Sequence, residues 1–371
     1  QLREGALPVL ELPVDLRRPA QQTFDGGSVP VSLPAAVAAQ LAALGRAHGC
    51  TLYQVMLGLW GLLLCRHSGQ DEVVIGSPYH GRDVAGTEAL VGYFVNMLAL
   101  RLEVQRGGSV GELLHGARRA ALDGMRHALV PFQQVVNELL PRRVYDPSRN
   151  AVFQTMLAWE EAAGWGGGSS GALGAALGVQ PAAAGLEQRV AKCDITLEAG
   201  STAEGAIEGA IEFNTSLHER SSVERLAERL GVLAAALGGA STEAEVWALP
   251  LMACGEAGQV LRTFNATAAE FPTDVCIHDL VGEQVVRQPD AVALEWRGAT
   301  LTYAELWASS GEVAAWLRAH GVVGDSVVAL LLRRSLELVV GVLGALRSGG
   351  AYLPMDLKWP ADRTAFLMED A

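Results

Sequence analysis

An apolar run at residues 52–65 constrains the fold of this chain more than any other feature of its sequence. The run reads LYQVMLGLWGLLLC, and the polar residue Gln54 interrupts it. Roughly 20 apolar residues are needed for a helix to cross a bilayer, so this run is too short to span a membrane. A helix that is apolar on every side is usually buried. Because Thr51 stands where a helix N-cap belongs, we predict a buried helix over residues 52–67.

Helical and strand-like patterns alternate on both sides of this apolar run. An extended connection is expected over residues 12–24. We expect helices that begin at Pro34 and that cover 109–127, 130–140 and 222–237. We expect strands over 71–77, 91–101, 152–159, 194–197 and 209–213. Strands and helices mixed in this way indicate an α/β domain over residues 1–240.

Two stretches of the chain lack such patterns. Residues 164–185 are rich in Gly, Ala and Ser, and we predict a mobile, exposed loop there because few of their side chains can be buried. Residues 241–272 are expected to form an interdomain linker.

After the linker the pattern starts again, and residues 273–371 are predicted to form a second α/β region. The expected elements follow in the order helix 277–287, strand 291–296, helix 302–320, strand 327–332, helix 335–348 and strand 351–353. Such a β-α-β alternation is typical of the beginning of a doubly wound sheet.

The charge and the cysteines exclude several classes of protein. The net charge is −13, and the sequence has no cluster of Lys and Arg of the kind that nucleic-acid binding requires. The five cysteines are odd in number and none are spaced as CxxC, so we predict no metal site. Buried free thiols in a reducing compartment are expected, which favours a cytoplasmic protein without a membrane segment.

Four motifs in the first half resemble, in order, the later motifs of condensation domains from nonribosomal peptide synthetases. They are VGYFVNMLALR at 91–101, HALVPF at 127–132, DPSRNAVF at 146–153 and KCDITL at 192–197. Residues 68–82 also fit the spacing of that family. The second motif departs from the family pattern HQDVPFE, because Ala128, Leu129 and Gln133 replace its polar part. The resemblance implies a mixed sheet covered by helices, similar to chloramphenicol acetyltransferase, with residues 91–100 and 152–159 in a common sheet.

The second half resembles the start of an AMP-forming adenylation domain from the same synthetases. The matching residues are IHDL at 277–280, QPDAVA at 288–293, LTYAEL at 301–306, LRSGGAYLPMD at 346–356 and WPADR at 359–363. The resemblance implies an incomplete doubly wound domain, and the order of the two domain types is characteristic of peptide synthetase modules.

The resemblance implies a parent protein that activates an amino acid with ATP and joins carrier-bound thioesters through a peptide bond. Its implied cofactors are ATP, Mg and the phosphopantetheine of carrier domains, and its implied partners are those carriers and the remaining parts of both domains. The family's HHxxxDG motif is absent from this sequence, where no two of the eight histidines are adjacent. Its phosphate-binding loop and catalytic Lys are also absent. We therefore expect no catalytic residue and no bound cofactor in this piece.

Three residues are candidates for the condensation site: Asn96, Arg101 and Arg149. Asn96 and Arg149 are polar residues beside apolar strand segments, so each lines a substrate tunnel or braces its own motif. Buried polar groups are usually hydrogen-bonded, which favours bracing. Arg101 at a strand end is more simply explained by a structural ion pair.

Other polar residues have structural explanations. His127 is expected at a helix end, without a carboxylate or nucleophile placed beside it in sequence. Thr302 and Glu305 form the pattern of a capping box. Gly349 and Gly350 precede a strand, so they indicate a helix-to-strand turn rather than a phosphate loop.

Two functional hypotheses follow. In the first, the chain is part of a working synthetase module. In the second, it is an inert piece of a truncated or decayed synthetase with a scaffold or docking role, a view to which the departures from the family motifs lend weight. In either case we expect the second region to fold only partly by itself, with exposed apolar residues around 327–332.

Overall fold

The computed structural model describes residues 7–82, 85–87, 90–139, 146–160 and 190–371. The expected loop at 164–185 lies outside these residues. The chain divides into two compact units, residues 1–266 and residues 267–371, and each unit is described here by itself.

The first unit contains a mixed sheet of six strands in the spatial order β1-β6-β5-β4-β2-β3. The strands are β1 (Gly26–Leu33), β2 (Glu72–Tyr79), β3 (Asn96–Glu103), β4 (Thr155–Glu160), β5 (Ile195–Ser201) and β6 (Ile207–Asn214). β4 is parallel to both β2 and β5, and the other neighbouring pairs are antiparallel. The segments 91–100 and 152–159 therefore contribute β3 and β4 to a common sheet, as the resemblance implied.

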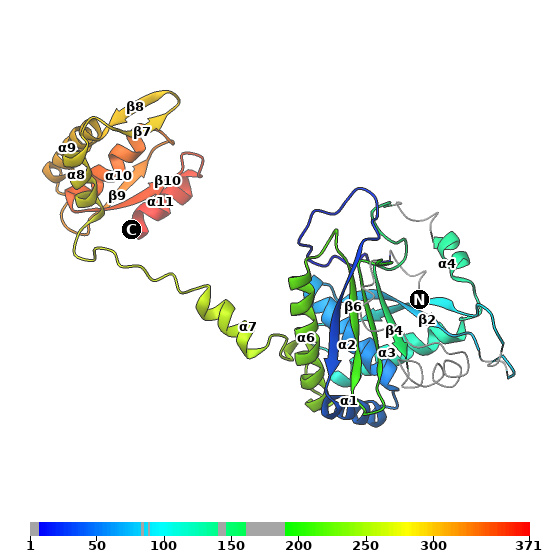
Figure 1. Ribbon diagram of the computed structural model, residues 1–371. Coiled ribbons are helices and arrows are strands. Elements are labelled where there is room, and N and C mark those ends of the chain that lie inside the picture. The colour runs from blue at the N-terminus through cyan, green and yellow to red at the C-terminus, as the bar shows by residue number, and fades with distance from the viewer. Residues whose placement is uncertain (1–6, 83–84, 88–89, 140–145, 161–189) are drawn as a thin grey trace. The chain divides into compact units, whose positions relative to one another are not determined.

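Four helices cover one face of this sheet (Figure 1). They are α1 (Ala35–Ala47), α2 (Leu52–Ser68), α3 (Val110–Arg126) and α6 (Arg220–Gly239). The short helix α4 (Phe132–Leu139) packs on the opposite face. Alternation along β2 separates the two layers, because Val73 and Ile75 enter the large core whereas Val74 enters the smaller one.

Helix α2 is the buried centre that its sequence predicts. Residues 54–65 are all buried, and Leu57 and Trp60 have no exposed surface. The indole N–H of Trp60 donates to Thr155 Oγ1 at 3.1 Å, which satisfies the one polar atom of that side chain. Thr51 and Gln54 form a reciprocal capping box at the N-terminus, so the polar interruption of the apolar run has a local role.

Two details of the first unit differ from the sequence prediction. Strand β1 was not predicted, although Val29, Val31 and Leu33 alternate into the core. Residues 91–95 were predicted as strand, but β3 begins only at Asn96, and Val91 and Tyr93 are almost fully exposed. An alternating or apolar pattern does not show whether a strand partner is available.

Part of the segment expected as a linker packs against the first unit. Val246, in the short 3-10 helix η2 (Val246–Ala248), is buried, and the Trp247 indole N–H donates to the Val104 carbonyl oxygen at 3.4 Å. Arg66 donates to the carbonyl oxygen of Leu249. The short helices α7 (Cys254–Gly258) and η3 (Gln259–Thr263) follow.

The second unit contains two small sheets. The strands β9 (Val327–Leu331) and β10 (Ala351–Met355) are parallel and are joined through α10 (Leu336–Ser348), which is the predicted β-α-β unit. The strands β7 (Val292–Trp296) and β8 (Ala299–Thr302) form an antiparallel hairpin. The remaining helices are α8 (Ile277–Arg287), α9 (Tyr303–Ala319) and α11 (Ala361–Asp370).

The hairpin strand β8 was not predicted, because residues 297–299 were interpreted as a turn that leads into a helix capped by Thr302. The expected exposed apolar surface around 327–332 is confirmed. Val327 and Leu331 are each 45% exposed, and Leu332 is 39% exposed.

All five cysteines are free thiols. Cys50, Cys65 and Cys193 are buried as expected, whereas Cys254 and Cys276 are exposed, so the prediction of burial was wrong for these two. Among the described residues no single helix has the length and hydropathy of a membrane span. Only α1 and α2 taken together reach that threshold, and they are bent by 104° at their junction.

Candidate functional site

Asn96 is the first residue of β3, and its side-chain amide contacts the turn between α3 and α4. Its Nδ2 donates to the carbonyl oxygens of Ala128 at 2.8 Å and Val130 at 2.7 Å. Its Oδ1 accepts the backbone N–H of Phe132 at 3.1 Å. Both donor hydrogens of the amide therefore have backbone partners, and the turn is held against the beginning of β3.

Arg101 lies farther along the same strand and pairs with a residue of β2. Its Nε and Nη2 both donate to Glu72 Oε2, at 2.9 Å and 2.6 Å. The two side chains keep 17% and 26% of their surface exposed, so the ion pair is partly buried. It links two neighbouring antiparallel strands near one end of the sheet.

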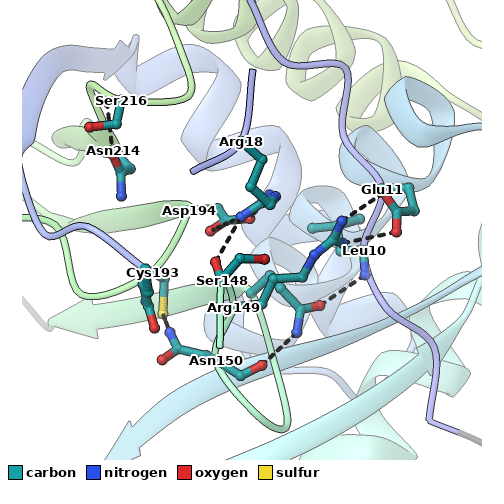
Figure 2. A network of polar contacts seen from close by, with 12 residues as sticks. Leu10, Glu11, Arg18, Ser148, Arg149, Asn150, Cys193, Asp194, Asn214 and Ser216 are labelled. Carbon is teal, nitrogen blue, oxygen red and sulfur yellow. Dashed lines mark hydrogen bonds and ion pairs between the residues drawn. The ribbon is translucent and has the colours of Figure 1, made fainter. Parts of the chain in front are cut away.

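Arg149 lies in the loop before β4 and connects that loop to the N-terminal segment (Figure 2). Its guanidinium donates to both carboxylate oxygens of Glu11, at 2.9 Å and 3.3 Å, and its Nε lies 3.2 Å from Asp146 Oδ2. Asp146 in turn accepts the backbone N–H and the hydroxyl of Ser148. These hydrogen bonds from Ser148 lower the pKa of Asp146, which keeps the carboxylate ionised beside the arginine.

A second arginine completes this network (Figure 2). Arg18 forms two hydrogen bonds with the carboxylate of Asp194 and also donates to the carbonyl oxygen of Ser148 at 3.3 Å. Asn150 donates to the Lys192 carbonyl oxygen at 2.8 Å and to Cys193 Sγ at 3.3 Å. The motifs at 146–153 and 192–197 are thus joined to each other and to the N-terminal segment.

Sequence reasoning did not single out Arg18 or Asp194 as a pair. The Pro- and Arg-rich composition of residues 12–24 indicated only an extended connection. A buried acidic residue inside an apolar motif was the available signal, because it requires a cationic partner somewhere in the fold.

His127 is the C-cap residue of α3, as the sequence predicted, and its side chain is exposed. The candidates therefore do not converge on one reactive centre: Asn96 contacts a turn, Arg101 pairs with β2, and Arg149 pairs with the N-terminal segment. These contacts orient backbone and side chains, and they place no nucleophile beside a base.

The Gly349–Gly350 turn does not fit a phosphate group. Gly349 has a left-handed φ of 95° as the C-cap of α10. The three successive amides of the turn donate within the unit: Gly349 N–H to Leu346 O, Gly350 N–H to Ala345 O, and Ala351 N–H to Ser326 O. Because phosphate loops require free amides, no ATP-dependent step is assigned to this turn.

One group of three potential metal ligands occurs in the described part of the chain, namely Cys276, His278 and Asp279 at the start of α8. Cys276 is exposed, and Asp279 Oδ2 already accepts the backbone N–H of Cys276 at 3.2 Å in a capping box. The helix cap explains the position of this carboxylate without a metal ion.

Two protein-family models match the chain. The condensation domain model matches residues 1–249, and the AMP-binding enzyme model matches residues 281–371.

Curated relatives match over almost the whole chain. It is 34% identical to tyrocidine synthase 3 of Brevibacillus parabrevis, 36% identical to malpinin synthetase of Mortierella alpina and 34% identical to surfactin synthase subunit 1 of Bacillus subtilis. The alignments cover 98%, 99% and 99% of this chain but only 6%, 5% and 10% of the respective relative.

Solved structures agree with these matches. A four-domain nonribosomal peptide synthetase bound to AMP and glycine is 26% identical with a TM-score of 0.74, and the match covers 99% of this chain and 28% of that one. The X-domain from teicoplanin biosynthesis shares the fold at 21% identity and a TM-score of 0.57, covering 67% of this chain and 54% of that domain.

Proposed function

This chain belongs to the nonribosomal peptide synthetases, with a condensation domain that leads into the start of an AMP-binding domain, and we propose that it works within a module that activates an amino acid and forms a peptide bond. The observation that carries the proposal is the order of the two family matches within one chain. Curated synthetases align across both parts, covering 99% of this chain.

In the proposed reaction, the amine of an aminoacyl thioester attacks the carbonyl carbon of an upstream acyl thioester. An amide bond forms, the carbon–sulfur bond breaks, and the thiol of the upstream carrier leaves. Phosphopantetheine arms of neighbouring carrier domains would present both thioesters. ATP and Mg would serve the preceding activation of the amino acid in the completed AMP-binding domain. We place the protein in the cytoplasm, where its five thiols stay reduced.

Within that module, the role of Asn96, Arg101 and Arg149 is to brace the condensation domain rather than to line a tunnel. The hydrogen bonds and ion pairs that these three side chains form within the domain support this bracing role. Asn96 holds the α3–α4 turn, Arg101 joins β3 to β2, and Arg149 ties its loop to Glu11. Bracing residues act through position, so their loss lowers activity by disturbing neighbouring backbone.

One observation favours the second hypothesis, an inert scaffold. Both donor hydrogens of Asn96 are used by the protein itself, and His127 is the exposed C-cap residue of α3. These contacts place no nucleophile beside a base, so chemistry requires residues from elsewhere in the parent protein.

Peptide formation by the parent protein tests the proposal. The protein that contains this chain is loaded with an aminoacyl group, supplied with an upstream acyl carrier, and analysed by mass spectrometry for the carrier-bound amide. We expect the amide, and we expect less of it for Asn96→Ala, with Asn137→Ala on the exposed surface of α4 as the control. Amino-acid loading without any amide would instead support the scaffold hypothesis.

A further inference from the structure

A cavity of about 460 Å³ opens beside the turn that Asn96 holds. It lies between the first residues of β3, the C-terminal end of α3 and the helix α4. Strand β3 is the last strand of the sheet in the part of the chain that the structure describes, so the cavity lies beside an edge strand. Its volume falls in the range of about 300–1,000 Å³ that is common for small-molecule sites.

The lining of this cavity is mostly apolar. Met97, Leu98 and Ala99 supply the β3 side, and Val130, Phe132 and Val135 supply the opposite side. Its polar side chains are Asp123 of α3 and His127, the C-cap residue of that helix. A predominantly apolar lining with few polar groups is typical of a pocket that binds a small apolar group.

The cavity walls are held in place by contacts made elsewhere. The three hydrogen bonds of Asn96 reach Ala128, Val130 and Phe132. They therefore hold the backbone that carries the lining residues Val130 and Phe132. The ring of Phe132 also packs against Phe153 with 5.4 Å between the ring centres. These contacts make the cavity a preformed feature rather than a gap between loose side chains.

Helix α3 approaches the strand closely at the floor of the cavity. A Cβ atom on Gly124 would lie 2.5 Å from a methyl carbon of Leu100, so a side chain at this position would require Leu100 to shift. Gly124 thus permits the close approach of α3 to β3 beside the cavity, and Val130 in the lining keeps 41% of its surface exposed.

The described lining of the cavity includes one acidic side chain. The carboxylate of Asp123 lies in the lining, with Arg126 at 2.8 Å as its ion-pair partner on the outer surface of α3. Arg126 keeps 73% of its side chain exposed, so water screens its charge and it offers weak compensation for a second carboxylate. A neutral side chain enters this cavity at less electrostatic cost than an acidic one.

We propose that this cavity binds the neutral apolar side chain of an aminoacyl thioester. The proposal rests on the proposed function, because the condensation reaction supplies substrates of this class. The turn that the three hydrogen bonds of Asn96 hold would then form one wall of a substrate pocket, so these bonds would also maintain the shape of that pocket.

Binding of stable substrate analogues to the complete 371-residue chain tests the proposal. The probes are the 2-acetamidoethylamides of leucine, phenylalanine, glycine and aspartate, in which an amide replaces the labile thioester. Dissociation constants are measured by NMR titration. We expect the leucine and phenylalanine probes to bind at least about tenfold more tightly than the glycine and aspartate probes, since a single methylene in an apolar pocket already contributes roughly 10–200-fold.

A matched pair of variants locates the binding site. Val130→Trp fills the opening and is expected to weaken leucine-probe binding at least about tenfold, as displacement of an apolar side chain requires. Leu129→Trp adds the same indole to the neighbouring residue, which is 93% exposed and outside the lining, and it is expected to bind like the wild type. If Val130→Trp does not fold by circular dichroism, Val135→Asn tests a second position on the same wall, with Gln134→Asn as its control.

Each outcome decides the proposal. Absence of binding to the wild type at millimolar probe, equal binding of all four probes, or unchanged binding by the Val130→Trp and Val135→Asn variants would overturn it. Peptide formation by the parent protein is a separate measurement. If that assay fails while leucine-probe binding shows the predicted pattern, the proposed function is wrong and the cavity assignment stands.

Discussion

The guanidinium of Arg18 and the carboxylate of Asp194 are 176 residues apart in sequence and form two parallel hydrogen bonds in the first unit, one of them 3.2 Å long (Figure 2). Asp194 keeps only 7% of its side chain exposed and Arg18 keeps 18%. The pair fastens the N-terminal segment to the start of β5. It therefore connects the beginning of the chain to one of the four family motifs.

Removal of one member of this pair is expected to destabilise the first unit strongly. Arg18→Ala leaves a buried carboxylate without its partner, which costs about 3–5 kcal/mol. Urea unfolding of the complete chain is monitored through the hydrogen exchange of peptides from α2, which reports the unfolding free energy of the first unit alone. Arg220→Ala breaks an exposed ion pair with Glu224 and is the matched control, with an expected loss below about 1 kcal/mol. Equal losses for the two variants would contradict the prediction.

The hydrogen bond between Trp60 and Thr155 gives a second prediction. Thr155→Val keeps the shape of the side chain but leaves a fully buried indole N–H without an acceptor, which costs about 1–3 kcal/mol of unfolding free energy. Thr155→Ser retains the hydroxyl, so more of the stability should remain. The same unfolding measurement checks both variants, and a Thr155→Val protein as stable as the wild type would show that this bond contributes little.

The stability of the first unit should fall in mild acid because of His67. Burial, the main cause, and the nearby Arg229 lower its pKa from 6.5 to about 4. Between these two values the unfolded chain binds a proton that the folded chain does not, so unfolding becomes easier as the pH decreases from 6.5 towards 4. His67→Gln is expected to reduce this slope. The residual slope includes His218, whose pKa burial also lowers. An unchanged slope in the variant would exclude His67 as a cause.

Residues 276–371 are expected to fold only partly when separated from the rest of the chain. The parallel pair β9–β10 leaves Val327 and Leu331 each 45% exposed, and small domains have only a few kcal/mol of net stability to lose. Calorimetry of this segment should show a broad transition or aggregation. A sharp, concentration-independent transition of a monomer would show that its core is sufficient.

Local signals predicted much of the fold. The N-cap at Thr51, the capping box at Thr302 and the helix-to-strand turn at Gly349 each depend on residues that are neighbours in sequence, and each is present. Strand β1 escaped prediction because Pro30 and two glycines weaken its pattern. Proline is tolerated there because β1 is an edge strand.

The candidate site was less predictable from sequence than the fold. The residues Asn96, Arg101 and Arg149 could be selected as polar positions in apolar motifs. Their partners could not be identified, because Ala128, Glu72 and Glu11 are brought to them only by the tertiary fold. The Arg18–Asp194 pair was missed for the same reason.

Amino-acid-dependent exchange of pyrophosphate into ATP tests the central claim most directly. The assay is performed with the 371-residue chain and with the parent protein that contains it, for each proteinogenic amino acid. We predict exchange by the parent for one amino acid or a few related ones, and none above a no-protein control for the chain alone. A parent protein that exchanges with no amino acid, or a chain that exchanges by itself, would contradict the account.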